Sequence, residues 1–222
     1  MNSKLYVPAN SASPPFTVAI TPEEAGWAES SLHVVDLGTE GSVSLNTGRT
    51  EVMILPLSGG GTVACGDDSF DLTPRASVFD GPADMVYLGI DQAYTISGHG
   101  RIAICGAQAT NAFPNRRVAA ADVAVELRGA GNCSRQVHNF GTATAFQADS
   151  LIACEVITPG GNWSSYPPHK HDEESEAEHE LEEIYYFEIR GDEHGPGMAF
   201  HGTYGTPDRP IHVAEMVANG DV

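Results

Sequence analysis

The run VMILPL at Val52–Leu57 is followed by Gly59–Gly61 and then by a second apolar run, TVAC, at Thr62–Cys65. Short apolar runs that are rich in β-branched residues and bounded by glycine are typical of β-strands joined by turns. An amphipathic helix would place its apolar residues at a spacing of 3.6, and this stretch shows no such stripe. It therefore predicts an antiparallel, all-β architecture.

The same pattern continues on both sides of this stretch. Further strand-like runs lie at Leu32–Val35, Ala76–Phe79, Met85–Leu88, Tyr94–Ile96 and Ile102–Cys105. Turn-forming residues separate them at Asn46–Gly48, Gly66–Asp68, Asp80–Pro82 and Ser97–Gly98. Short strands at such even spacing predict an antiparallel sandwich or barrel.

A second set of strand-like runs occupies the last third of the chain. These runs are Leu151–Thr158, Glu183–Ile189, Ala199–Tyr204 and His212–Val217, preceded by a short one at Val123–Leu127. We expect an irregular arm at 1–30, a first barrel at 31–122, a connecting segment at 123–149 and a second barrel at 150–222. The second barrel is shorter than the roughly 100 residues that eight strands with turns need, so we expect it to be incomplete.

Charge and composition narrow the classes of partner. The 222 residues carry a formal net charge of −19, which disfavours nucleic acid and anionic membrane surfaces as partners. No apolar run is long enough to span a bilayer, and prolines at 8, 14 and 15 interrupt the first twenty residues, which do not resemble a signal peptide. The four cysteines form no Cys-x-x-Cys pair and predict reduced thiols buried in the core. We therefore expect a cytoplasmic protein.

The densest chemistry lies at His169 and His171, followed at a distance by Glu182 and Glu183. Residues two apart on a strand face the same side, so both imidazoles can converge on one ion. A carboxylate from the next strand would complete a set of two histidines and one carboxylate that leaves coordination positions open for substrate. Alternation alone does not choose between the two glutamates, because either choice leaves aromatic residues inside.

Simpler interpretations compete with the metal site. A histidine pair can belong to a polar surface strand, but the carboxylate on the following apolar run favours metal binding. The acidic stretch 172–180 is typical of a solvated loop between two strands. The remaining histidines are scattered, which is typical of structural or exposed residues.

Four separate segments resemble the 5-deoxy-glucuronate isomerase family of inositol catabolism. They are GNWSSYPPHKHD at 161–172, ELEEIYY at 180–186, SVFDGP at 77–82 and VELRGAGN at 125–132. The similarity runs from about residue 32 to the end of the sequence. It implies a double cupin, that is, two jelly-roll β-barrels, with the metal in the C-terminal barrel.

The resemblance also implies a ligand set. The family binds its metal through a His-x-His pair, a glutamate and a later histidine, which places the first three ligands at His169, His171 and Glu183. The later histidine follows a Gly-Asp turn, and Gly220–Val222 resembles the start of that segment. We therefore expect the fourth ligand beyond Val222 in a longer form of the chain; the alternative is a substitute such as His201 or His212.

The first barrel lacks a His-x-His pair. At the place where its ligands would be expected, Glu51 alone would bind a metal weakly. The resemblance implies that this barrel is a structural or dimerising half.

The function implied by the resemblance is an aldose–ketose isomerisation, from 5-deoxy-glucuronate to 5-dehydro-2-deoxy-gluconate. A divalent ion would stabilise the negative charge of an enediolate; zinc and manganese fit first, and iron and nickel are compatible. Tyr185 is a candidate proton relay, with a metal-bound hydroxide as the alternative. Arg128 is a candidate for binding the carboxylate of the sugar acid, because an arginine fork suits a carboxylate.

Two other functions share these residues. A set of two histidines and one carboxylate also serves dioxygenases, so another metal cupin enzyme is one alternative. A non-catalytic sugar-binding cupin is the second. The sequence shows no DNA-binding helix pair, and it leaves the metal and the oligomeric state open, a homo-oligomer being compatible with it.

Overall fold

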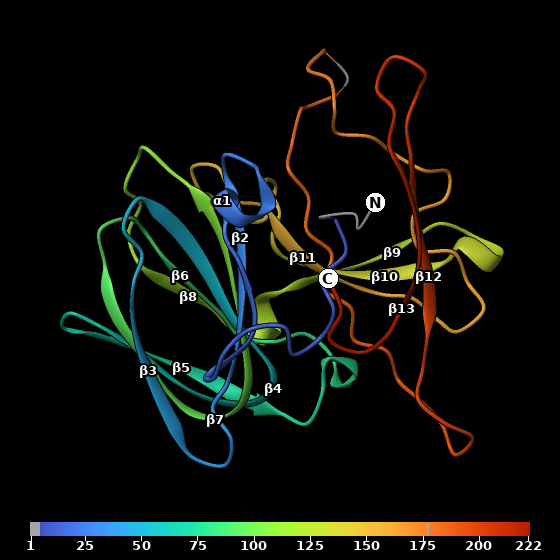
Figure 1. Ribbon diagram of the computed structural model, residues 1–222. Coiled ribbons are helices and arrows are strands. Elements are labelled where there is room, and N and C mark those ends of the chain that lie inside the picture. Colours follow the sequence, from blue (N-terminus) through green and yellow to red (C-terminus); the bar gives the residue numbers. More distant parts are fainter. Residues whose placement is uncertain (1–4, 177) are drawn as a thin grey trace.

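The computed structural model describes residues 5–176 and 178–222, and its ordered elements are almost all β-strands (Figure 1). The all-β prediction is confirmed. The first unit is an eight-stranded sheet in the order β1-β2-β7-β4-β6-β8, in which β3 pairs with β7 and β5 pairs with β4. Its strands are β1 (Phe16–Ile20), β2 (Ser30–Asp36), β3 (Gly41–Asn46), β4 (Thr50–Cys65), β5 (Asp68–Arg75), β6 (Met85–Leu88), β7 (Ala93–Gln108) and β8 (Arg116–Val118).

Two long strands hold this sheet together. β4 and β7 each run for 16 residues, and they pair with one another along most of their length. The predicted turns at Gly59–Gly61 and Ser97–Gly98 are therefore wrong. These glycines lie where the two strands approach closely: a Cβ on Gly61 would lie 2.1 Å from the carbonyl oxygen of Ser97. Glycine is needed there for close backbone contact rather than for a chain reversal.

Other predicted boundaries also need correction. The arm at 1–30 is not wholly irregular, because it contains β1, which pairs with β2, and the helix α1 (Pro22–Ala25) capped by Thr21. The predicted strand Ala76–Phe79 is instead a turn that enters a 3-10 helix at Val78–Asp80. Ser77 starts that helix with a capping box, since its hydroxyl accepts a hydrogen bond from the Phe79 N–H while the Asp80 carboxylate accepts one from the Ser77 N–H.

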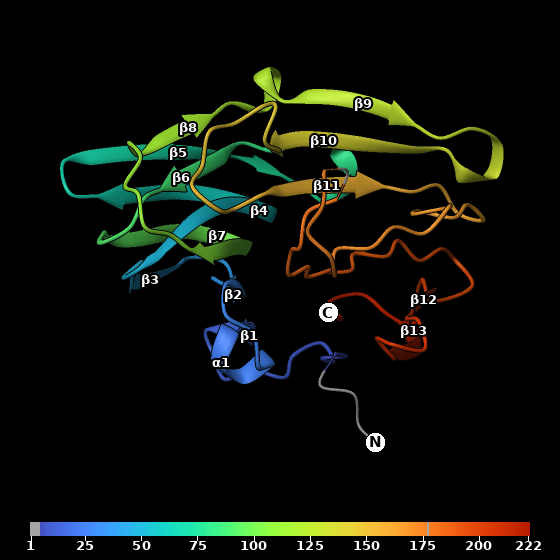
Figure 2. The same ribbon diagram turned by 90° about the horizontal axis from the view of Figure 1, so that it is seen from above.

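The second unit contains two smaller sheets, which lie in separate layers (Figure 2). One has the order β11-β10-β9, formed by β9 (Ala124–Arg128), β10 (Arg135–Gly141) and β11 (Ala153–Ile157). The other pairs β12 (Ala199–Tyr204) with β13 (His212–Val217). The stretch 123–149 is thus more than a connecting segment, because it supplies β9 and β10. The predicted strand Glu183–Ile189 lies in extended chain outside the sheets.

Alternating residues of the first sheet point into two separate hydrophobic cores. Ile54 and Ile104 face a core inside the first unit. Their neighbours Met53 and Leu55 face a second core, which also contains Phe140 and other residues from the later part of the chain. The second core contains residues of both units, so the two units share buried apolar contacts.

Glu51 is fully buried at this junction. Its carboxylate accepts a hydrogen bond of 2.6 Å from the Tyr87 hydroxyl and three more from the backbone N–H groups of residues 149, 150 and 151. These four donors satisfy the buried charge. Glu51 therefore fixes the segment that leads into β11. Across the part of the chain that the structure describes, no helix combines the length and the apolar character that crossing a membrane requires.

Candidate metal site

His169 and His171 lie on an extended segment without strand pairing, and their rings meet edge to face with centroids 4.9 Å apart. Lys170, between them, points away and pairs with Glu173 and Glu178 at 2.6 Å each. The two histidines therefore share one side of the chain, although the segment is not the regular strand that the sequence predicts.

The acidic stretch 172–180 connects the two segments that carry the predicted ligands. The Leu181 N–H donates to the His171 carbonyl oxygen at 2.9 Å, which closes the stretch into a loop. Arg209 pairs with Asp172 at 3.2 Å and with Glu173 at 3.4 Å. The described side chains of this loop are mostly exposed, as expected for a solvated loop.

The structure separates Glu182 from Glu183. The Glu183 carboxylate lies 3.5 Å from Nε2 of His169. The Glu182 carboxylate turns to the first unit and accepts hydrogen bonds from the N–H groups of Ala28, Glu29 and Ser30. Alternation along the extended chain therefore puts Glu183 next to the histidines, which is the choice that the resemblance implied.

Aromatic side chains form a wall beside this cluster. Tyr185 and Phe187 are stacked with centroids 6.2 Å apart, and His201 on β12 lies 5.4 and 5.6 Å from them. Burial raises the pKa of Tyr185, and the charge of Glu183 raises it further, so the phenol is protonated at neutral pH. Burial lowers the pKa of His201, against the opposing effect of Glu183. His212, the other substitute ligand considered, is exposed on β13, and it joins no such cluster in the described part of the chain.

The donor set fits a divalent ion. One ligand atom each from His169, His171 and Glu183 lies within 4.8 Å of the other two. Ligand atoms that share one zinc ion lie roughly 3 to 4 Å apart, because each bond is about 2.1 Å long, so small side-chain rotations close the difference. The side chains of His169 and Glu183 are 44% and 42% exposed, which leaves an open side for a substrate. These three are the one such group among residues 5–176 and 178–222.

Arg128 is not part of this cluster. It lies on β9, and its guanidinium pairs with Glu126 at 2.9 Å, which raises the pKa of Arg128. No contact of Arg128 with the three predicted ligands occurs among the described residues. All four cysteines are free, but Cys154 is exposed rather than in the core.

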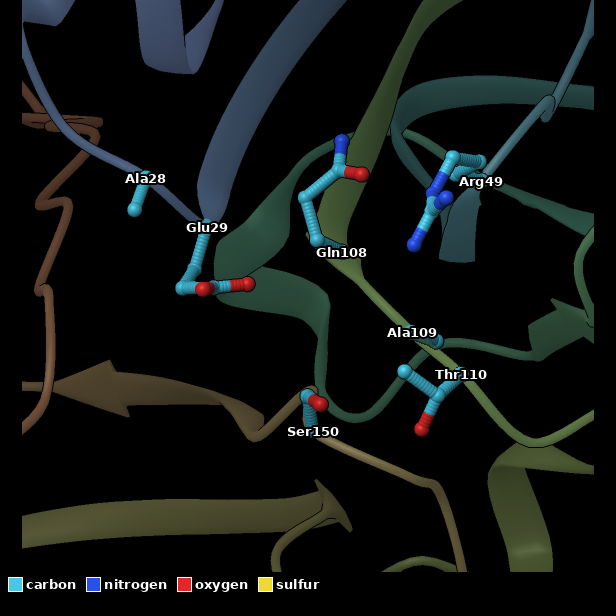
Figure 3. Close-up of a pocket in the computed structure, with 7 residues that line it drawn as sticks. All are labelled: Ala28, Glu29, Arg49, Gln108, Ala109, Thr110 and Ser150. Carbon is cyan, nitrogen blue, oxygen red and sulfur yellow. The ribbon is translucent and has the colours of Figure 1, made fainter.

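A separate pocket lies where residues 28 and 29 of the first unit approach Ser150 (Figure 3). It measures about 440 Å³ and is lined by Ala28, Glu29, Arg49, Gln108, Ala109, Thr110 and Ser150. None of the predicted site residues lines it. Its two charged residues, Glu29 and Arg49, have opposite signs, so the lining carries no net formal charge.

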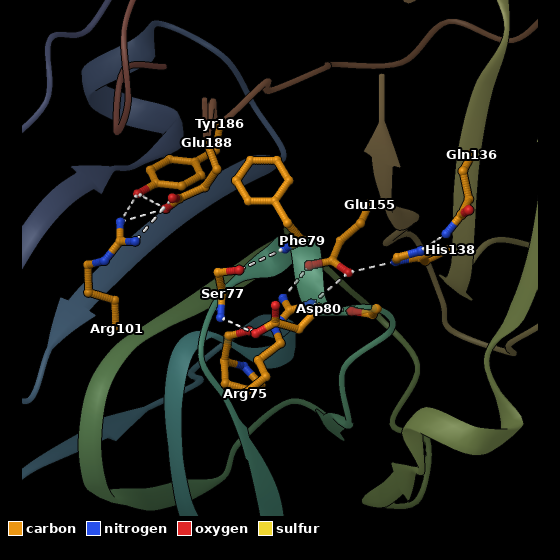
Figure 4. A network of polar contacts seen from close by, with 12 residues as sticks. Arg75, Ser77, Phe79, Asp80, Arg101, Gln136, His138, Glu155, Tyr186 and Glu188 are labelled. Carbon is orange, nitrogen blue, oxygen red and sulfur yellow. Dashed lines mark hydrogen bonds and ion pairs between the residues drawn. The ribbon is translucent and has the colours of Figure 1, made fainter. Parts of the chain in front are cut away.

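Sequence reasoning missed the polar contacts between the two units (Figure 4). Arg101 on β7 binds Tyr186 and Glu188, and Arg75 on β5 binds Glu155 of β11. These pairs are 80 to 87 residues apart in sequence, and no local signal joins them. The alternation of side-chain directions along Glu182–Glu188 could be predicted from the sequence. The residues of the first unit that bind the side chains facing away from the site could not.

Comparison with known proteins assigns the chain to a family. A model of the KduI/IolB family matches residues 5–222. The chain is 35% identical, over 99% of its length and 80% of the relative's, to a protein of Geobacillus kaustophilus named 5-deoxy-glucuronate isomerase. It is 36% identical to a protein of the same name from Bacillus subtilis, over 85% of this chain and 70% of the relative.

A solved structure agrees with these relatives. The crystal structure of an IolB-like protein from Salmonella typhimurium superposes with a TM-score of 0.89 and 31% identity, covering 98% of this chain and 82% of that one. The likeness in fold extends across both units and includes the segments that carry the histidine–glutamate cluster. The chain belongs to the KduI/IolB family.

Proposed function

We propose that the protein is a metal-dependent aldose–ketose isomerase that converts 5-deoxy-glucuronate to 5-dehydro-2-deoxy-gluconate in inositol catabolism. The observation that carries the proposal is the convergence of His169, His171 and Glu183 on an open side of the second unit. The names of the relatives supply the reaction.

These three residues would hold one divalent cation, with zinc or manganese as the first choices. Bound there, the ion would supply a Lewis acid that stabilises negative charge on substrate oxygens. The neutral imidazoles would leave the ion acidic, and the carboxylate would hold it in place. The exposed side of the cluster supports access for a small sugar acid.

Tyr185 would hold or pass the proton that moves between neighbouring carbons. It lies two residues from Glu183 on the same side of the chain, next to His201. A protonated phenol is a donor at neutral pH, which suits a relay that returns a proton to the substrate.

Arg128 would bind the carboxylate of the substrate through its two-pronged guanidinium. It would exchange its present partner Glu126 for the substrate. Replacing Arg128 with alanine should raise KM about tenfold or more, since a charge-assisted hydrogen bond contributes roughly 1.5 to 3 kcal/mol. An unchanged KM would remove Arg128 from the site.

The test combines metal analysis with turnover. The purified protein should contain about one metal ion per chain and should convert the sugar acid to the ketose, followed by NMR, without taking up oxygen. His169→Ala should lose both the metal and the turnover, whereas Glu180→Ala, which removes an exposed carboxylate nearby, should keep both. Stoichiometric metal retained in His169→Ala would place the ligands elsewhere.

The same experiment separates the two alternatives. Oxygen uptake on turnover would favour a dioxygenase, because isomerisation consumes no oxidant. Binding of the sugar acid to the metal-loaded protein without turnover would favour a non-catalytic sugar-binding cupin. A cytoplasmic location and a homo-oligomeric state stay predictions from the sequence.

A further inference from the structure

The segment that carries Glu183 and Tyr185 lacks the backbone support of a sheet. Among the residues that the structure describes, its backbone-to-backbone hydrogen bonds occur at its ends: Leu181 donates to His171, and Phe187 exchanges bonds with Gly220 and Asp221. Between those ends no ladder fixes the direction of the side chains. A metal ligand held this way would be free to rotate unless other contacts orient it.

Glu182 supplies the first of these contacts. Its two carboxylate oxygens accept the N–H groups of Ala28, Glu29 and Ser30 at 2.7, 3.0 and 2.6 Å. Three consecutive N–H groups that converge on one carboxylate stabilise its charge and fix its position. Because neighbours on an extended chain face opposite ways, anchoring Glu182 to the first unit turns Glu183 toward His169.

Arg101 supplies the second contact. Its guanidinium bonds to both oxygens of Glu188, at 2.5 and 3.1 Å, and to the Tyr186 hydroxyl at 3.0 Å (Figure 4). The Tyr186 hydroxyl also donates to Glu188 at 3.1 Å. The rest of the Tyr186 ring packs on the core between the units. Fixing residues 186 and 188 on one side leaves Tyr185 and Phe187 on the other, beside His201.

We infer that Glu182 and Arg101 are positioning residues, through which the first unit orients the metal ligand Glu183 and the neighbouring Tyr185. The inference rests on the proposed metal site. The first unit then has a role in the site, although none of its described residues is among the three proposed metal ligands. The anchored residues, Glu182 on one side and Tyr186 and Glu188 on the other, enclose Glu183 and Tyr185 in the sequence. Losing either anchor should therefore weaken metal binding, although neither Glu182 nor Arg101 contacts the metal or the substrate.

The experiment measures the affinity for Mn²⁺ alone, from the EPR signal of the free ion, in the folded 222-residue chain. Glu182→Ala and Arg101→Met should each weaken Mn²⁺ binding about 10- to 100-fold, the range found when groups that orient metal ligands are removed. Glu182→Gln and Arg101→Lys keep part of each contact and should recover part of the affinity. Glu180→Ala and Arg49→Met remove the same charges from exposed positions and should bind Mn²⁺ like the unaltered protein.

The same measurement on His169→Ala gives the background Mn²⁺ binding that comes from the acidic loop at 172–180. If it binds Mn²⁺ as tightly as the unaltered protein, the metal site itself is wrong, and the inference is overturned with it. If His169→Ala loses the ion while folded Glu182→Ala and Arg101→Met keep full affinity, the inference alone is overturned. A lower melting temperature of the metal-free variants with an unchanged Mn²⁺ affinity would mean that the anchors only stabilise the fold, which also overturns it.

Discussion

At the scale of single residues, hydrogen bonds to distant parts of the chain determine which of two neighbouring glutamates faces the histidines. Glu182 and Glu183 are identical side chains on the same segment, and the residue pattern alone does not rank them. The structure separates them because three N–H groups some 150 residues earlier in the chain bind Glu182. His169 and His171 could be predicted because their spacing is local, whereas the anchor of Glu182 is not a local feature.

Asp84 provides a residue-scale prediction of pH dependence. Burial would raise the pKa of this carboxyl, but hydrogen bonds from Thr73, Arg117 and Ala120 lower the pKa to about 2. A carboxyl whose pKa is lower in the folded chain contributes stability above its unfolded pKa, which is about 3.9, and this contribution is lost as the pH falls toward 2.

The Asp84→Asn variant should therefore be less stable than the unaltered protein at pH 6, and the difference should shrink between pH 4 and pH 2. Urea unfolding at a series of pH values measures it. Asp67→Asn changes an exposed carboxyl and serves as the control. A difference between the two proteins that stays constant from pH 6 to pH 2 would contradict the low pKa of Asp84.

At the scale of elements, the sequence predicted strands well and their lengths poorly. Met85–Leu88 and His212–Val217 occur as predicted because they are short apolar runs with turn residues on both sides. The long strands β4 and β7 were divided in the prediction, because glycine signals a turn as readily as a close approach. The segment at Glu183–Ile189 has the composition of a strand but no neighbouring strand to pair with, and only the tertiary arrangement reveals this.

The close pairing of β4 and β7 gives a prediction at this scale. A methyl group at Gly61 would lie 2.1 Å from the Ser97 carbonyl oxygen, so Gly61→Ala must push the two strands apart. We expect a loss of about 1 to 3 kcal/mol in the free energy of unfolding, as for other overpacked sites. Gly160→Ala is the matched control, since nothing lies within 4 Å of the added methyl group. Equal stability of the two variants in urea would show that the strands do not approach so closely.

At the scale of the whole molecule, a shared core and buried polar contacts join the two units. Arg75 from the first unit pairs with Glu155 of the second, with side chains only 7% and 12% exposed. Glu155 also bonds to Nδ1 of His138, whose Nε2 lies 2.6 Å from the Gln136 amide (Figure 4). The sequence predicted two β units. The contacts between them could not be predicted, because they depend on side chains that are distant in sequence and meet only after folding.

Breaking this pair from one side should be costly. Arg75→Met leaves Glu155 buried without its cation, and we expect a loss of about 3 to 5 kcal/mol in the free energy of unfolding. Adding Glu155→Gln removes the stranded charge, so the double variant should be more stable than Arg75→Met alone. Denaturant unfolding of both single variants and the double variant completes a double-mutant cycle. Simple additivity of the two losses would mean that the pair does not couple the units.

The account depends most on the metal between His169, His171 and Glu183, and anomalous diffraction tests it most directly. Crystals of the full chain grown with zinc should show, in data collected at the zinc edge, a strong peak about 2.0 to 2.2 Å from one ligand atom of each residue. The main peak lying on other residues, or zinc-loaded crystals without a peak at these three side chains, would contradict the account.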